Sequence, residues 1–294
     1  MTFRVLLPEH LDPLRNGALL TGGVGPRPIA LVSTRSAAGL RNLAPFSFFN
    51  AFGANPPMVA FGPNRRARDG TLKDTYRNAV ATGEFVIAAV SHAMVEQMNL
   101  TSAEYPEGVD EFLKAGFTPL PARRVRPDLV AEAPFQMECR LHRELELGAG
   151  PGSGLLLVGE VLAFQVREDC LAGEALDPRR LDLVGRLGGS WYARASGAAL
   201  FQLPKPVGQP IGWQALPELL RGSAILTGND LGQLADCAEL PDPERAQRRP
   251  GDPPDGAGLE RAIQAALAHR DLDEAWRLAG VRVREDAGPG PARS

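Results

Sequence analysis

Residues 27–63 read RPIALVSTRSAAGLRNLAPFSFFNAFGANPPMVAFGP, and this stretch decides the fold. The apolar runs at residues 29–32 and 58–61 predict two short strands, because each is bounded by turn-forming residues. Residues 36–39 carry the turn chemistry that follows the first run. A further strand is predicted between the two runs, so the stretch reads as three short strands.

Residues 42–50 form the informative middle of this stretch. In an extended backbone Asn42, Ala44 and Phe46 share one face, while Pro45 and Ser47 lie on the other. Proline cannot donate to a strand ladder, so Pro45 marks a sheet edge or a bulge, where neighbouring N–H groups are free for a small, acceptor-rich ligand. An ordinary edge strand that tolerates a proline is the alternative.

The motifs RPIALVST (27–34), NLAPFSFFNA (42–51), the prolines at 56–57 and KDTYRN (73–78) resemble the flavin reductase-like family. This family includes flavoredoxin and the reductase components of two-component monooxygenases. RLGG, from residue 186, resembles its last typical stretch. The resemblance implies a mainly β protein, an antiparallel Greek-key split β-barrel that binds FMN, with peripheral helices and here a helical C-terminal extension.

Composition bounds the function of this 294-residue chain. Its 44% hydrophobic and 23% charged residues are those of a globular protein, and a net charge of −3 argues against general nucleic-acid binding. No signal peptide or membrane-length apolar run is found, so we expect a cytoplasmic protein without membrane contact. The three cysteines and four histidines are scattered, so no metal site is expected.

A helix is predicted from about residue 74 to Thr82, with Asp74 or Thr75 as its cap and Gly83 as its end. Lys73 stands beside the helix start, where N–H groups and a cation together suit a phosphate. A capped helix after a lysine is also common without a ligand. The resemblance favours the phosphate site, because family members hold the FMN phosphate at KDT.

The predicted cofactor-binding residues match the three chemical parts of FMN. Lys73, Asp74 and Thr75 are assigned to the phosphate, and Asn42, Ser47 and Asn50 to hydroxyls and the polar rim of the ring. The strand residues Leu31, Ala44, Pro45 and Phe46 complete the set as the neighbouring surface, mainly apolar. Many members have Trp where Leu31 stands. Arg65, Arg66 and Arg68 either add to the phosphate site or form a solvated loop.

The middle of the chain predicts a strand at 84–91, a helix at 92–100, and a hairpin of strands 134–147 and 155–166 with Gly159 as a candidate bulge. His142 lies on a polar strand face, so it is interpreted as solvated in preference to a nicotinamide contact. Trp191 and Tyr192 pack either on the flavin edge or on a dimer partner.

The predicted domains are residues 1–203, the FMN-binding domain, and 204–294, a C-terminal extension. Residues 1–26 are interpreted as a flexible lead. The extension contains a linker, short helices, a mobile loop at 241–258 and a helical hairpin followed by a disordered tail at 287–294. We expect the hairpin to pack on the barrel or on a second subunit, because it cannot bury its apolar stripe alone.

The resemblance implies an NAD(P)H-dependent flavin oxidoreductase that passes hydride from NADH or NADPH to FMN and works as a homodimer, with a monooxygenase as a candidate partner for the reduced flavin. The flavin carries the redox chemistry, so no catalytic acid or base is assigned. One alternative is an FMN-bound electron carrier similar to flavoredoxin. Another is a non-catalytic binding or scaffold protein whose flavin site has decayed.

Overall fold

The computed structural model describes residues 2–206 and 208–286. Contacts divide the chain into two compact units, Met1–Phe201 and Gln202–Ser294. The principal strands are β2 (Ala30–Arg35), β3 (Arg41–Phe46), β4 (Phe49–Ala54), β5 (Pro57–Phe61), β6 (Glu84–Ala89), β9 (Phe135–Glu146) and β10 (Leu155–Val166). The shorter strands are β1 (Arg27–Pro28), β7 (Pro119–Leu120), β8 (Leu129–Val130), β11 (Leu171–Ala172), β12 (Ala175–Leu176), β13 (Val184–Arg186) and β14 (Tyr192–Arg194).

Helices belong to both units. The first unit contains α1 (Pro13–Gly23), α2 (Asp74–Thr82), α3 (Val95–Leu100), α4 (Glu111–Ala115) and α5 (Pro178–Leu181). The second contains α6 (Glu218–Arg221), α7 (Gly228–Ala235), α8 (Gly256–Ala268) and α9 (Leu272–Asp286). Single 3-10 turns lie at Pro8–His10, His92–Met94, Glu168–Cys170, Gly197–Ala199, Trp213–Ala215 and Pro243–Arg245.

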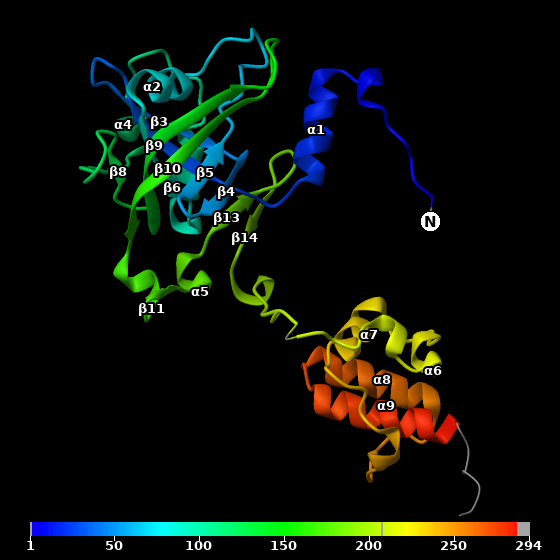
Figure 1. Ribbon diagram of the computed structural model, residues 1–294. Coiled ribbons are helices and arrows are strands. Elements are labelled where there is room, and N and C mark those ends of the chain that lie inside the picture. The colour runs from blue at the N-terminus through cyan, green and yellow to red at the C-terminus, as the bar shows by residue number, and fades with distance from the viewer. Residues whose placement is uncertain (1, 207, 287–294) are drawn as a thin grey trace, which may run out of the picture. The chain divides into compact units, whose positions relative to one another are not determined.

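The first unit is built on a seven-stranded sheet in the order β3-β2-β6-β9-β10-β5-β4, with every neighbouring pair antiparallel. The long β9–β10 hairpin, green in Figure 1, lies at its centre. Strand β3 is an edge strand, as Pro45 predicted. The antiparallel class is confirmed, but no β3–β4 pairing closes the barrel among the described strands, and a Greek-key closure is not seen.

Strand β2 explains why the sheet carries two cores. Its side chains alternate, so Ala30 and Val32 join one apolar cluster with Phe46 and Phe61. Leu31 instead joins a second cluster, which α3, α4 and β13 help to complete. Both faces of β2 are therefore covered, which is why its apolar run is nearly continuous.

The bulge predicted at Gly159 is confirmed by a register shift between Val158 and Gly159 where β10 pairs with β9. A methyl group at Gly159 would overlap the ring of Phe85, which is fully buried. The glycine therefore leaves room for this ring in the core. The predicted hairpin thus forms with its irregularity in the expected place.

The N-terminal region differs from the predicted flexible lead, because residues 13–23 form α1. Asp12 caps this helix by accepting a hydrogen bond from the Arg15 N–H at 2.8 Å, and Pro13 occupies its first turn. Its side chains are exposed or half-buried, including Leu14 and Leu20. Asp12 and Pro13 are typical of a helix start. The residues that follow them show no helical period that predicts a buried face.

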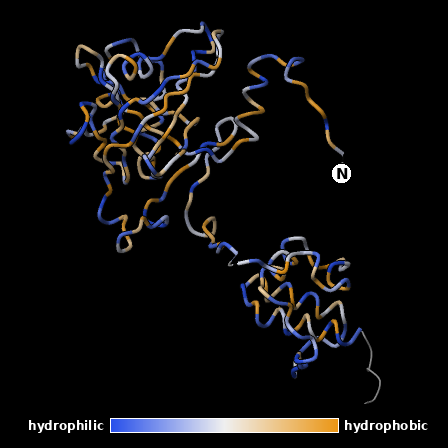
Figure 2. The backbone as a smooth tube through the Cα atoms, viewed as in Figure 1, coloured by the Kyte–Doolittle hydropathy of each residue, from blue (hydrophilic) through white to orange (hydrophobic). Residues whose placement is uncertain are grey.

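The second unit has a core of its own. Leu259, Ile263 and Leu267 on α8 pack with Leu278 on α9, and α6 and α7 supply further leucines. Figure 2 shows apolar and polar stretches alternating along these helices. The expectation that the hairpin needs the barrel or a second subunit is therefore wrong, because the short helices before it cover the apolar stripe.

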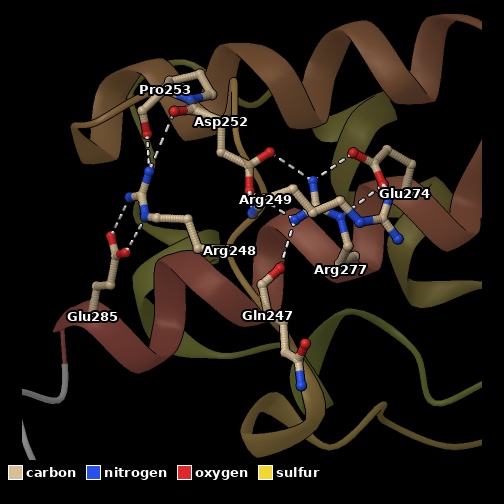
Figure 3. Close-up of polar contacts among 8 residues, drawn as sticks. All are labelled: Gln247, Arg248, Arg249, Asp252, Pro253, Glu274, Arg277 and Glu285. Atoms are coloured by element: carbon tan, nitrogen blue, oxygen red, sulfur yellow. Dashed lines mark hydrogen bonds and ion pairs between the residues drawn. The ribbon is translucent and has the colours of Figure 1, made fainter.

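Ion pairs join part of the predicted mobile loop, residues 248–252, to α9 (Figure 3). The Arg277 guanidinium pairs with Asp252 at 2.8 Å and Glu274 at 2.5 Å, and Arg248 pairs with Glu285 at 2.7 Å. Only about a tenth of the Arg277 and Asp252 side chains is exposed. The mobile-loop prediction is thus corrected for residues 248–252, since Arg248, Arg249 and Asp252 have partners on α9. The predicted disordered tail, 287–294, lies outside the described residues.

Candidate functional site

The start of α2 is an unsatisfied helix terminus. Lys73, and not Asp74 or Thr75, occupies the N-cap position, and no side chain caps the helix among the described residues. The first backbone hydrogen bond runs from the Arg77 N–H to the Lys73 carbonyl, so the preceding N–H groups have no acceptor within the described chain. The helix ends at Gly83 in the left-handed conformation, as predicted.

A hollow of about 230 Å³ opens at this helix start. Lys73 and Arg66 line it, and the Lys73 ammonium lies 5.1 Å from the centroid of the Phe46 ring. Burial and the nearby Arg66 lower the pKa of Lys73, and Glu104 partly opposes this shift. Two cations and free N–H groups therefore converge on one small hollow, which favours an anion.

Polar side chains line the inner part of the hollow. The Asn42 amide donates to the Thr75 hydroxyl at 2.9 Å and to the Thr34 hydroxyl at 3.2 Å. Thr75 is buried and Asn42 nearly so. This network holds β3 against α2, so the two predicted parts of the site are joined by hydrogen bonds.

Glu111 on α4 also lines the hollow and was not predicted. Its carboxylate accepts a hydrogen bond from the Leu43 N–H at 3.0 Å, which satisfies a backbone donor on the β3 edge. Burial raises the pKa of Glu111. Its contribution to stability is therefore fully present below the ordinary glutamate pKa and is lost as the pH rises through the folded-state pKa.

A second hollow, of about 250 Å³, adjoins the first through Pro45 and Phe46, which line both. Arg27 and Ser47 line it, and the Arg27 Nε donates to the Ser47 hydroxyl at 3.3 Å. Arg27 also donates to three carbonyls, those of Thr21, Val24 and Leu187. Burial, with a smaller effect of Arg186, lowers the pKa of Arg27.

The structure brings most of the predicted site residues together. Apart from Asp74, six of them line the first hollow, Asn42, Ala44, Pro45, Phe46, Lys73 and Thr75, and Ser47 lines the second. Asp74 lines the first hollow too, but its carboxylate is paired with Arg77. The group of Asp74 that suits an anion is therefore its backbone N–H.

Two predicted residues lie elsewhere. Leu31 is fully buried in the second apolar cluster, so its side chain is not presented to a ligand. Asn50 on β4 lines a separate hollow of about 630 Å³ and not the hollow at α2. Its side-chain oxygen accepts a hydrogen bond from the Ala51 N–H. The exposed His142 lies on the polar face of β9, as interpreted.

The second hollow is also lined by Arg27 and Arg186, which sequence reasoning did not assign, and by Tyr192, which it placed on the flavin edge or on a dimer partner. Arg27 was part of the quoted motif, but its burial depends on carbonyls up to 160 positions away. Arg186 and Tyr192 line both the second hollow and an adjacent one of about 450 Å³. The Arg186 guanidinium lies 4.6 Å from the Tyr192 ring centroid, so this aromatic ring is held from within the chain, while Trp191 is exposed.

Comparison with known proteins decides the family. The flavin reductase like domain matches residues 23–180, more than half of the chain. The chain belongs to the flavin reductase-like family. The matched part of this flavin reductase-like protein contains β3, α2 and the whole lining of the first hollow, whereas Arg186 and Tyr192 of the second hollow and the second unit lie outside the match.

Relatives agree with this membership. An uncharacterized protein of Halalkalibacterium halodurans is 36% identical over 203 residues, which are 68% of this chain and 96% of the relative. The crystal structure of nitrilotriacetate monooxygenase component B from Bacillus cereus is 34% identical, with a TM-score of 0.65, over 69% of this chain and 100% of that one. Flavoredoxin of Desulfovibrio vulgaris is 26% identical, with a TM-score of 0.52, over 60% and 90%.

No described helix of this flavin reductase-like protein is long and apolar enough to cross a membrane. No group of three or more histidine, cysteine or acidic side chains within the described ranges is placed to hold a metal ion.

Proposed function

We propose that this protein binds FMN in the two adjoining hollows and transfers hydride from NADH or NADPH to flavin. The observation that carries the proposal is the uncapped start of α2, where Lys73 and Arg66 face the same small hollow. FMN carries a dianionic phosphate, and free N–H groups beside two cations suit such a group. The family and its flavin-related neighbours support the same ligand class.

The residues present fit the rest of the mononucleotide. Each hollow alone is small for such a ligand, but Pro45 and Phe46 line both, so a mononucleotide would extend across these two residues. Pro45 and Phe46 would supply an apolar wall for the ring, and Ser47 and Asn42 polar groups for hydroxyls. FMN, when bound, supplies the hydride-accepting chemistry.

The chain's own task is therefore to hold and orient. Lys73, Arg66 and the first N–H groups of α2 would hold the phosphate, and the Asn42–Thr75 hydrogen bond keeps strand and helix in place. The Glu111 carboxylate accepts a hydrogen bond from the Leu43 N–H on the edge strand β3. This bond helps to fix the strand that carries the apolar wall. We assign no acid or base to the hydride step.

A single assay tests the activity. Purified protein is titrated with FMN, followed by fluorescence quenching, and NADH and NADPH oxidation are then recorded with and without added FMN. We expect quenching of FMN and steady nicotinamide oxidation that depends on flavin. Absence of quenching would contradict FMN binding and favour a scaffold with a decayed flavin site.

Similarity to flavoredoxin favours a second candidate, an FMN-bound electron carrier. In that case bound flavin would be reduced by a protein donor and not by NADH or NADPH. The same assay separates the two, because a carrier retains its flavin and shows no steady nicotinamide oxidation. Similarity to a monooxygenase component supports a monooxygenase as the consumer of reduced flavin, which co-oxidation of a monooxygenase substrate in a coupled assay would test.

Two copies of the chain are proposed to pair as a homodimer through the hollow of about 630 Å³ in the first unit. Its lining is mainly apolar, and Phe164, which stacks on Phe135, is 54% exposed. An apolar hollow of this size is a candidate protein interface. Sedimentation velocity should give a dimer mass that Phe164→Glu lowers to a monomer, while Phe52→Glu, at an exposed site outside the hollow, does not. A monomeric wild type would contradict the pairing.

A further inference from the structure

The hollow at α2 contains a carboxylate as well as its cations. Glu104, in the loop after α3, lines this hollow. Its two oxygens approach the Arg66 Nε at 4.0 Å and an Arg68 Nη at 3.3 Å. Glu104 therefore lies beside Arg66, the arginine in the hollow's lining that a phosphate there would use.

The two arginines differ in how firmly they are held. Arg66 donates to the Thr71 hydroxyl at 3.2 Å and to the Leu72 carbonyl at 2.8 Å, and its side chain is 20% exposed. Arg68 is 72% exposed and also pairs with its neighbour Asp69. Arg66 is thus a fixed cation at the hollow, and Glu104 is the nearby anion that reduces its attraction for a ligand.

We propose that Glu104 is a specificity-determining residue that weakens the hold on the flavin phosphate, so that FMN exchanges as a substrate. This rests on the proposed function, because it needs FMN at the α2 hollow. A bound phosphate must either displace the carboxylate from Arg66 or remain beside it and be repelled. Either outcome raises the FMN dissociation constant and leaves riboflavin, which has no phosphate, unaffected.

The expected size of the effect is moderate. Glu104 is 60% exposed, so water and salt screen its charge. Removing one such like charge a few ångströms from a phosphate should tighten FMN binding by about threefold to tenfold. The effect should shrink at high salt, because it is electrostatic.

The test compares Glu104→Gln with the wild type by calorimetric titration of FMN and of riboflavin at low and high salt. Glu107→Gln is the matched control, because Glu107 lies in the same loop, is 82% exposed and pairs with Arg77 at 3.4 Å outside the hollow's lining. We expect Glu104→Gln alone to tighten FMN binding, with riboflavin unchanged. Glu104→Ala should give the same result if the charge is responsible.

Three outcomes would overturn the inference. Unchanged or weaker FMN binding in both Glu104 variants would show that the carboxylate does not oppose the phosphate. Equal tightening of FMN and riboflavin would show an effect on the ring and not on the phosphate. No FMN binding by the wild type or any variant would overturn the proposed function itself, which distinguishes that failure from the first two.

Discussion

Lys73→Ala is expected to raise the FMN dissociation constant by roughly 10- to 100-fold, the loss typical of one charge-assisted contact. Lys73 lies at the uncapped start of α2, and its ammonium faces the hollow that Arg66 also lines. Riboflavin should lose no more than about threefold in affinity, because it lacks the phosphate that this charge would bind. Fluorescence titration with both flavins measures the two constants.

Lys114→Ala is the control for this variant. Lys114 also lies over an aromatic ring, with its ammonium 6.0 Å from the Tyr105 ring centroid, but it does not line the hollow. We expect its FMN affinity to equal that of the wild type. If Lys73→Ala weakens FMN and riboflavin equally, Lys73 supports the ring wall at Phe46 and not the phosphate.

Arg277→Ala should destabilise the second unit by about 3 kcal/mol, because it leaves the Asp252 carboxylate without its principal partner in a nearly enclosed position. Trp276 packs against that unit's core, so tryptophan fluorescence during urea unfolding follows the loss. Arg261→Ala, at an exposed position on α8, should change stability by less than about 0.5 kcal/mol. Equal stability of the two variants would contradict the role given to the Arg277 pairs.

The same pairs predict a dependence on pH. The Arg277 guanidinium lowers the pKa of Asp252 from 3.8 to about 2. A carboxylate with a depressed pKa contributes stability above its ordinary pKa and loses it as the pH falls through the folded-state pKa. The second unit should therefore lose stability between about pH 4 and 2, and Arg277→Ala should show a shallower loss in this window.

Local patterns predicted the elements that depend on local chemistry. The alternation along β3, the edge position of Pro45, the end of α2 at Gly83 and the bulge at Gly159 all follow from backbone geometry or side-chain period. The helix itself was predicted where α2 lies, and the anion site at its start stays a prediction. The cap of the helix was not predicted correctly, because Lys73 occupies a position that Asp74 or Thr75 would fill by propensity.

The predictions that failed concern which distant parts of the chain pack against a given strand or helix. An apolar run does not state whether one or both faces of a strand are covered, so Leu31 was taken as a ligand surface although a second cluster buries it. Glu111 contacts the Leu43 N–H across 68 positions, and no local signal joins them. The core of the second unit likewise depends on the packing of α6 and α7 against the α8–α9 hairpin, whereas the prediction considered that hairpin alone.

The uncapped start of α2 determines how the proposed anion site tolerates sequence change. Its N–H donors belong to the polypeptide itself, so they survive any substitution at residues 73–75 other than proline, provided that the helix is kept. Substitutions of these side chains would thus change the affinity for a phosphate without removing the backbone N–H groups that bind it. Distant homologues that lack the lysine are therefore expected to retain a weak affinity for phosphorylated ligands at this turn.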